Sequence, residues 1–141
     1  MKKLFFILLI SLGIAQTAKA DTIDYWHVYY NKIKIRDFTY LSTNDIVLKL
    51  DSVKKGDVIV VKYFRDTHCT NCTTRLTVED EKHHVVATSK GKGGYNPLSF
   101  SVNDLVEFKK STGKDTFEIF YYEGEIKSNT DKTPIFRIKL E

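Results

Sequence analysis

Short runs of alternating apolar and polar residues recur along most of this chain, and this period of two is the feature that most limits its fold. A β-strand points successive side chains to opposite faces, so alternation is typical of a strand with one buried face. In one run, Ile33 and Ile35 share a face and basic residues occupy the other. The clearest runs are KIKIR at 32–36, DIVLKL at 45–50, TTRLTVE at 73–79 and TFEIFYY at 116–122.

Clusters of turn-forming residues separate these runs. They are KKGD at 54–57, EDEK at 79–82, KGKGGYNP at 90–97 and STGKD at 111–115. Another run, VIVVKYF at 58–64, is apolar on both faces, as an interior strand would be. Short strands at close spacing are typical of all-β domains. We therefore predict an all-β fold, an antiparallel β-sandwich of about eight or nine strands.

One segment departs from this pattern and predicts a helix. Ser101 and Asp104 form the S-x-x-D pattern of a capping box, in which side chains bond the first free backbone amides of a helix. Gly113 follows where such a helix would stop. We predict one short helix near 102–111.

The N-terminal segment has the features of a secretory signal peptide. Two lysines open the chain, an apolar run follows at 4–14, and Ala-Lys-Ala at 18–20 resembles a cleavage site. The apolar run is shorter than the roughly 20 residues that span a bilayer. We therefore expect residues 1–20 to be removed and residues 21–141 to form a single domain. The product would be exported, to the periplasm or the exterior of a bacterium.

Removal of the signal peptide also changes the charge of the chain. The whole sequence has 22 basic and 18 acidic residues, a net charge of +4. Lys2, Lys3 and Lys19 leave with the signal peptide, so the mature chain keeps 19 basic residues against 18 acidic ones. A nucleic-acid-binding domain would carry a clear basic surplus, so we expect no nucleic-acid partner. We also expect no transmembrane segment in the mature chain.

The only two cysteines, Cys69 and Cys72, lie three residues apart in DTHCTNC. Export would place them in an oxidising compartment. A turn brings such residues close enough for a disulfide, and Asp, Thr and Asn favour a turn. We predict a Cys69–Cys72 disulfide that clips one loop at the edge of the sandwich.

Two alternatives for this motif stay open. His68, Cys69 and Cys72 could bind zinc or copper, because CxxC is half of a common zinc spacing. A thiol–disulfide oxidoreductase would instead need Cys69 at the start of a helix. The residues after Cys72 alternate like a strand, which disfavours that alternative. His83 and His84 would lie at the far end of this strand, too distant to share a metal ion with the cysteines.

The first strand of the mature domain suggests a binding face. In IDYWHVYYN at 23–31, Trp26, Val28 and Tyr30 share one face, while Tyr25, His27 and Tyr29 share the other. One face can join the core. The other face is either an ordinary tyrosine-rich solvent face or an aromatic surface for a sugar ring or a protein.

These observations lead to a functional expectation. We expect a non-enzymatic, exported binding or accessory module of the bacterial envelope, with a protein or carbohydrate partner. Its candidate binding residues are Tyr25, His27 and Tyr29, together with the Cys69–Cys72 loop. We assign no catalytic residue and expect no cofactor. The alternatives are a metal-binding protein and a thiol oxidoreductase. The sequence does not indicate the oligomeric state.

Overall fold

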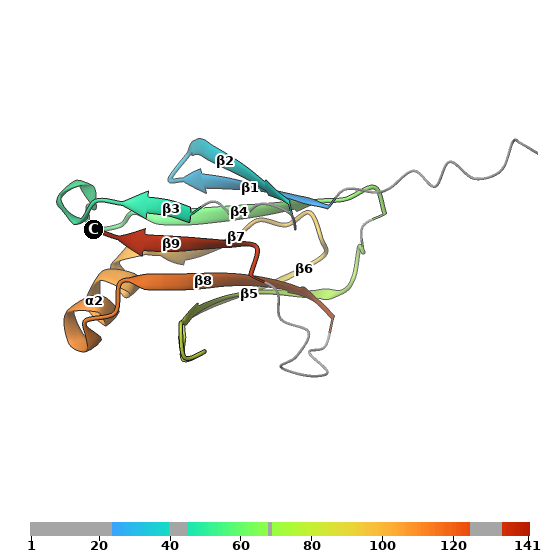
Figure 1. The fold of residues 1–141 in the computed structure, drawn as a ribbon. Helices are drawn as coiled ribbons and strands as arrows, with labels where there is room; N and C mark the ends of the chain where they lie inside the picture. The colour runs from blue at the N-terminus through green and yellow to red at the C-terminus, as the bar shows by residue number, and fades with distance from the viewer. Residues whose placement is uncertain (1–23, 40–44, 68, 125–133) are drawn as a thin grey trace, which may run out of the picture.

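A computed structural model describes residues 24–39, 45–67, 69–124 and 134–141. The predicted signal peptide, residues 1–20, lies outside these ranges, and so does His68. Two β-sheets pack face to face and one α-helix stands at an end of the sandwich, as Figure 1 shows. The predicted all-β sandwich is therefore confirmed, with nine strands in the described part of the chain.

Four strands form one sheet and five form the other. The four-stranded sheet has the order β2 (Ile33–Thr39), β1 (Tyr25–Tyr30), β4 (Val58–Phe64), β7 (Leu98–Ser101). The five-stranded sheet has the order β3 (Asp45–Leu48), β9 (Phe136–Leu140), β8 (Thr116–Glu123), β5 (Thr73–Asp80), β6 (Val85–Lys92). Neighbouring strands are antiparallel except for β3 and β9, which are parallel to each other. These two strands lie far apart in the sequence.

Alternation along each strand builds the core between the sheets. On β1, Trp26 and Val28 are buried; on β4, Ile59 and Val61 are buried. VIVVKYF forms an interior strand, as predicted, because β4 pairs with β1 on one side and β7 on the other. Both sheets therefore contribute one face to a single apolar core.

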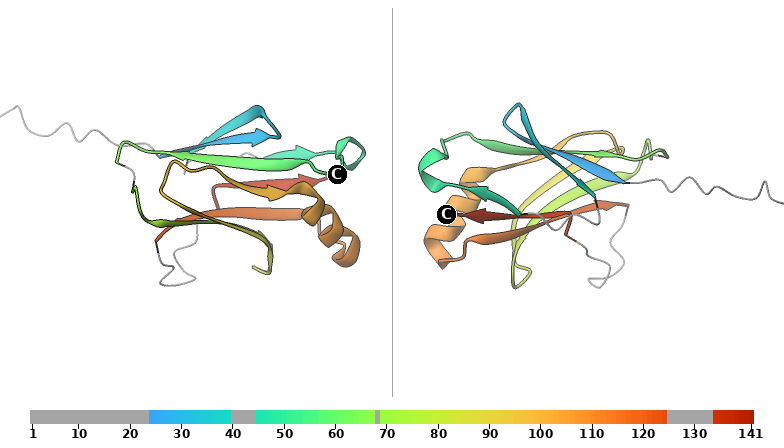
Figure 2. Two further views of the ribbon diagram at one scale, coloured as in Figure 1. Left: turned by 180° about the vertical axis from the view of Figure 1, so that it is seen from behind. Right: turned by 45° about the horizontal axis from the view of Figure 1, so that its top comes forward.

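The helix α2 (Val102–Thr112) confirms the predicted helix, with Ser101 before its first residue and Gly113 after its last. The side chain of Ser101 accepts a hydrogen bond from the amide of Asn103, and Gly113 ends the helix with a φ of 76°. Val102 and Leu105 are fully buried against the sandwich. Both views in Figure 2 show α2, in orange, at the same end of the sandwich as the C-terminus. No helix in the described ranges is long and apolar enough to cross a membrane.

Two details differ from the alternation in the sequence. Ile33 and Ile35 are 72% and 40% exposed, because β2 is an edge strand and Ile35 is the extra residue of a β-bulge. Thr77 and Glu79, which alternation places on the polar face of β5, are buried. β5 lies between β8 and β6, so neighbouring side chains cover its outer face from both flanks.

A buried aspartate fixes the turn that joins β5 to β6. The Asp80 carboxylate accepts hydrogen bonds from the amides of Lys82 and His84, from the His84 ring, and from the Lys114 ammonium. Burial alone would raise the pKa of Asp80, but these hydrogen bonds outweigh it and hold the pKa well below its ordinary value. The carboxylate thus remains charged and links the turn to the segment before β8.

Candidate ligand-binding face and disulfide loop

The outer surface of β1 carries the three predicted binding residues. Tyr25 is 37% exposed, and His27 and Tyr29 are half-buried. Trp26 and Val28 point the other way into the core. The structure therefore confirms the predicted division of β1 into two faces. Whether Tyr25, His27 and Tyr29 bind a ligand stays a prediction.

Strand β4 extends this surface with two residues that sequence reasoning missed. Phe64 lies opposite Tyr25, and their rings stack with centroids 5.3 Å apart and planes 10° apart. The Phe64 ring also meets the edge of His27, with centroids 4.6 Å apart. The Lys62 ammonium lies 5.0 Å from the centre of the Tyr29 ring. The alternation in VIVVKYF already placed Lys62 and Phe64 on one face, but it did not show that β4 pairs with β1.

Tyr95 completes the surface from the connection between β6 and β7. Its ring is 46% exposed and lies 6.1 Å from that of Phe64, centroid to centroid. Its hydroxyl donates a hydrogen bond of 3.2 Å to the carbonyl of Arg65. Sequence reasoning treated this glycine-rich segment only as a connection. We call the set Tyr25, His27, Tyr29, Phe64 and Tyr95 the aromatic face.

Charged side chains border the aromatic face. The His27 ring contacts the carboxylate of Asp37 on β2, and the Lys34 ammonium lies 3.1 Å from the same carboxylate. Partial burial would raise the pKa of Asp37, but the hydrogen bonds from His27 and Lys34 outweigh it and lower the pKa. The aromatic face thus has a polar margin with donors and an anionic acceptor.

The loop between β4 and β5 holds Cys69 and Cys72 at disulfide distance, as the sequence predicts, with Cα atoms 5.7 Å apart. Strand β5 begins at Thr73, directly after the motif, so Cys69 does not precede a helix. Figure 1 places this loop and α2 at opposite ends of the sandwich.

Backbone hydrogen bonds tie the disulfide loop to the turn that carries Tyr95. The amides of Gly93 and Gly94 donate to the carbonyls of Cys72 and Cys69, each at 2.8 Å. Gly93 has a φ of 83°, and a Cβ atom there would lie 2.9 Å from the Thr70 carbonyl oxygen. Only glycine suits both this conformation and this contact. The disulfide loop and Tyr95 therefore belong to one hydrogen-bonded unit.

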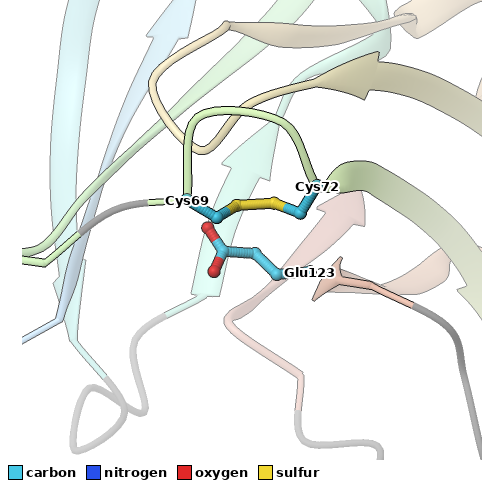
Figure 3. Close-up of side chains that lie close together, drawn as sticks. All are labelled: Cys69, Cys72 and Glu123. Atoms are coloured by element: carbon cyan, nitrogen blue, oxygen red, sulfur yellow. A yellow bond between two sulfur atoms is a disulfide. The ribbon is translucent and has the colours of Figure 1, made fainter.

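The carboxylate of Glu123, at the end of β8, points at the disulfide, as Figure 3 shows. Ligand atoms of Cys69, Cys72 and Glu123 all lie within 4.8 Å of one another. The Arg65 guanidinium binds Glu123 Oε2 at 3.1 Å. A hydrogen bond with Tyr63 raises the pKa of Arg65, so the guanidinium stays charged. Sequence reasoning did not connect Glu123 with the cysteines.

The three histidines that the structure describes lie apart from the cysteines: His27 is on β1, and His83 and His84 are in the turn between β5 and β6. His68, part of the alternative metal site, lies outside the described residues, so that alternative is untested. His83 and His84 lie at the opposite end of β5 from Cys72, as expected. There they contact Glu79 at 3.3 Å and Asp80 at 2.9 Å.

A cleft formed by described residues lies away from the aromatic face. It has a volume of about 760 Å³ and opens between α2 and a short 3-10 helix, η1 (Leu50–Ser52). Two of its three lining lysines bond other groups of the protein: Lys109 bonds the Leu140 carbonyl and Lys110 bonds Glu107.

Comparisons with protein-family models, with curated proteins and with solved structures find no match to this chain. What the protein does has to be inferred from its own residues.

Proposed function

We propose that this protein is an exported, non-enzymatic binding module of the bacterial envelope, which holds a protein or carbohydrate partner on its aromatic face. One observation supports this most directly. Five rings from three separate segments gather, partly exposed, on the outside of the four-stranded sheet, where the core does not need them. Aromatic side chains combine a large apolar area with polar tips, and they are enriched at binding surfaces.

The chemistry of the aromatic face suits a large partner. The rings stand on the surface of a sheet, so they offer a broad contact area instead of a closed cavity. Rings can pack against a sugar or against apolar side chains, while the tyrosine hydroxyls, Lys62 and the His27–Asp37 pair provide hydrogen bonds. These groups are the ones that fix the orientation of a partner.

The disulfide loop has a supporting role in this proposal. Its hydrogen bonds to Gly93 and Gly94 restrain the turn from which Tyr95 projects. A surface that is already ordered loses less conformational entropy when a partner binds. The disulfide loop thus holds Tyr95 beside Phe64 before the partner arrives.

Export is supported by the composition of residues 1–20 and by the disulfide. N-terminal sequencing of the protein recovered from the producing bacterium tests it. A mature chain that begins at Asp21 and fractionates with the periplasm or the medium is expected. A cytoplasmic chain that keeps residues 1–20 would refute export.

Site-specific photo-crosslinking tests the binding role. A photoreactive phenylalanine analogue replaces Tyr25 or Tyr95 in the intact producing cell, and the matched control carries it at the exposed Glu107 on α2. Crosslinked products at Tyr25 and Tyr95, but not at Glu107, are expected for a protein partner. A glycan array probed with the wild-type protein and with Tyr25→Ala covers the carbohydrate partner. If neither experiment gives a signal that depends on the aromatic face, the proposal fails.

A further inference from the structure

The surroundings of Cys69 and Cys72 contain more than a disulfide requires. A disulfide is uncharged and gains nothing from a carboxylate beside it, yet the Glu123 carboxylate lies next to the bond, with an oxygen within 4.8 Å of both sulfur atoms (Figure 3). We infer that reduction of the disulfide creates a zinc site in which Cys69, Cys72 and Glu123 bind one Zn²⁺ ion. This inference concerns the end of the sandwich and does not depend on the proposed partner of the aromatic face.

The positions of the ligand atoms fit a tetrahedral zinc ion. The three ligand atoms lie within 4.8 Å of one another in the oxidised protein. Zinc binds thiolate sulfur at about 2.3 Å, which places two sulfur ligands about 3.8 Å apart. After reduction, rotation of the two cysteine side chains can open that separation without a change in the backbone. The spacing of two residues between Cys69 and Cys72 is one that zinc sites use.

Glu123 is already oriented as a ligand. Its Oε2 atom accepts the hydrogen bond from Arg65 at 3.1 Å, while the Tyr121 hydroxyl lies 3.5 Å from Oε1. Of the two oxygens, Oε1 has the longer contact, and we assign it as the atom that would bind the metal. Groups that hold a metal ligand from behind fix its orientation and strengthen binding.

The loop keeps its shape when the sulfur–sulfur bond is absent. The hydrogen bonds from Gly93 and Gly94 hold the backbone at both cysteines. These bonds do not involve the side chains, so reduction does not remove them. The two thiols would stay close to Glu123 instead of separating.

The charges favour a divalent cation. Two thiolates and Glu123 carry three negative charges, and Arg65 supplies one positive charge, so a divalent ion makes the set neutral. Without a cation, the carboxylate opposes formation of the thiolate that a thiol oxidoreductase needs. The same carboxylate thus disfavours thiol catalysis and favours metal binding.

The reaction needs a reductant, which would be an exported dithiol protein. The dithiol gives two electrons and two protons to the disulfide, becomes a disulfide itself, and leaves Cys69 and Cys72 as thiols. Zinc binding then releases these two protons to solvent as two zinc–sulfur bonds form. Water would occupy the fourth position of the zinc ion.

Zinc titration tests the site. The mature protein is reduced with a phosphine, and a chromophoric chelator competes with it for Zn²⁺, so that the colour of the chelator reports the affinity of the protein. The reduced wild type should bind one Zn²⁺ per chain, and the oxidised protein and Cys69→Ser/Cys72→Ser should bind none. Glu123→Gln should weaken binding by about tenfold or more. The control is Glu118→Gln, on the same strand, which should bind like the wild type. Equal affinity of Glu123→Gln and the wild type would overturn the inference.

X-ray absorption of the zinc-loaded wild type provides a measurement that does not depend on variants. Two sulfur and two lighter ligands per zinc are expected. Four sulfur ligands would show that two chains share the ion, and fewer than two would exclude the cysteine pair. Either result would overturn the inference even if Glu123→Gln failed to fold.

Discussion

The ring of Tyr25 on β1 lies stacked on the ring of Phe64 on β4, with the two centroids 5.3 Å apart and the planes within 10°. The two residues are 39 positions apart but face each other directly in the register of the sheet. This pair is the centre of the aromatic face, since His27 and Tyr95 both contact Phe64. Replacing these rings should affect partner binding more than folding.

The first prediction contrasts two neighbours on β1. Trp26→Ala should lower the free energy of unfolding by about 3–5 kcal/mol, because Trp26 is 1% exposed within the core. Tyr25→Ala should lower the free energy of unfolding by about 1 kcal/mol, which is the contribution of an aromatic pair near the surface. Urea denaturation followed by circular dichroism measures both. Equal losses would mean that Tyr25 is needed for folding and is not reserved for a partner.

The second prediction concerns the disulfide. A bond that closes a loop of four residues removes little conformational entropy from the unfolded chain. The corresponding stabilisation of the folded protein is about 2 kcal/mol. Cys69→Ser/Cys72→Ser should therefore lower the free energy of unfolding by about 2 kcal/mol. Adding a reductant should destabilise the wild type by a similar amount and leave the variant unchanged. Complete unfolding on reduction would contradict a local role for this disulfide.

The third prediction compares two glycines with positive φ. Gly93→Ala should be more destabilising than Gly56→Ala, by about 1–2 kcal/mol. Both substitutions place alanine in a strained conformation, at φ 83° and 92°. A Cβ atom at Gly93 also meets the Thr70 carbonyl oxygen at 2.9 Å, whereas one at Gly56 meets nothing within 4 Å. Thermal unfolding of the two variants gives the comparison, and equal losses would show that the disulfide loop can move aside.

The fourth prediction is a pH dependence carried by Asp80. Its pKa is held below the ordinary value in the folded protein, so it binds a proton more readily when unfolded. The contribution of the Asp80 carboxylate to the free energy of unfolding is therefore fully present above about pH 5, and it is lost as the pH falls below about 4. Asp80→Asn should lower the free energy of unfolding by about 2–3 kcal/mol at pH 7.

The difference between Asp80→Asn and the wild type should shrink as the pH falls from 5 to 3. Denaturation curves across this range measure the difference. Asp66→Asn, at an exposed position in the loop after β4, serves as the matched control and should follow the wild type. A constant difference between Asp80→Asn and the wild type would show that the charge of Asp80 does not contribute.

Local patterns in the sequence predicted much of this structure. Alternation on β1 assigned Trp26 to the core and His27 to the surface, and both assignments follow from the geometry of a single strand. Ser101 and Gly113 marked the ends of α2, because capping depends on the nearest few residues. These features need no knowledge of which strands pair.

Features that depend on strand pairing were not predictable. Glu123 reaches the disulfide only because β8 pairs with β5 in a register that places Glu123 opposite Thr74. Tyr95 lies beside Phe64 because hydrogen bonds from Gly93 and Gly94 tie its turn to the disulfide loop. The exposure of Ile35 results from a bulge that alternation does not reveal. Each of these features depends on contact between two separate segments of the chain.

The position of β9 has a consequence for how the protein reaches its native state. This strand follows all the others in chain order, yet it lies between β3 and β8, and Arg137 pairs with Asp45 at 2.9 Å. The five-stranded sheet cannot be completed until β9 pairs with β3 and β8. Contacts between residues so far apart in the sequence form slowly. Until β9 pairs with both neighbours, the sheet stays in two parts, and β3 and β8 each keep an unpaired edge that can pair with a wrong strand.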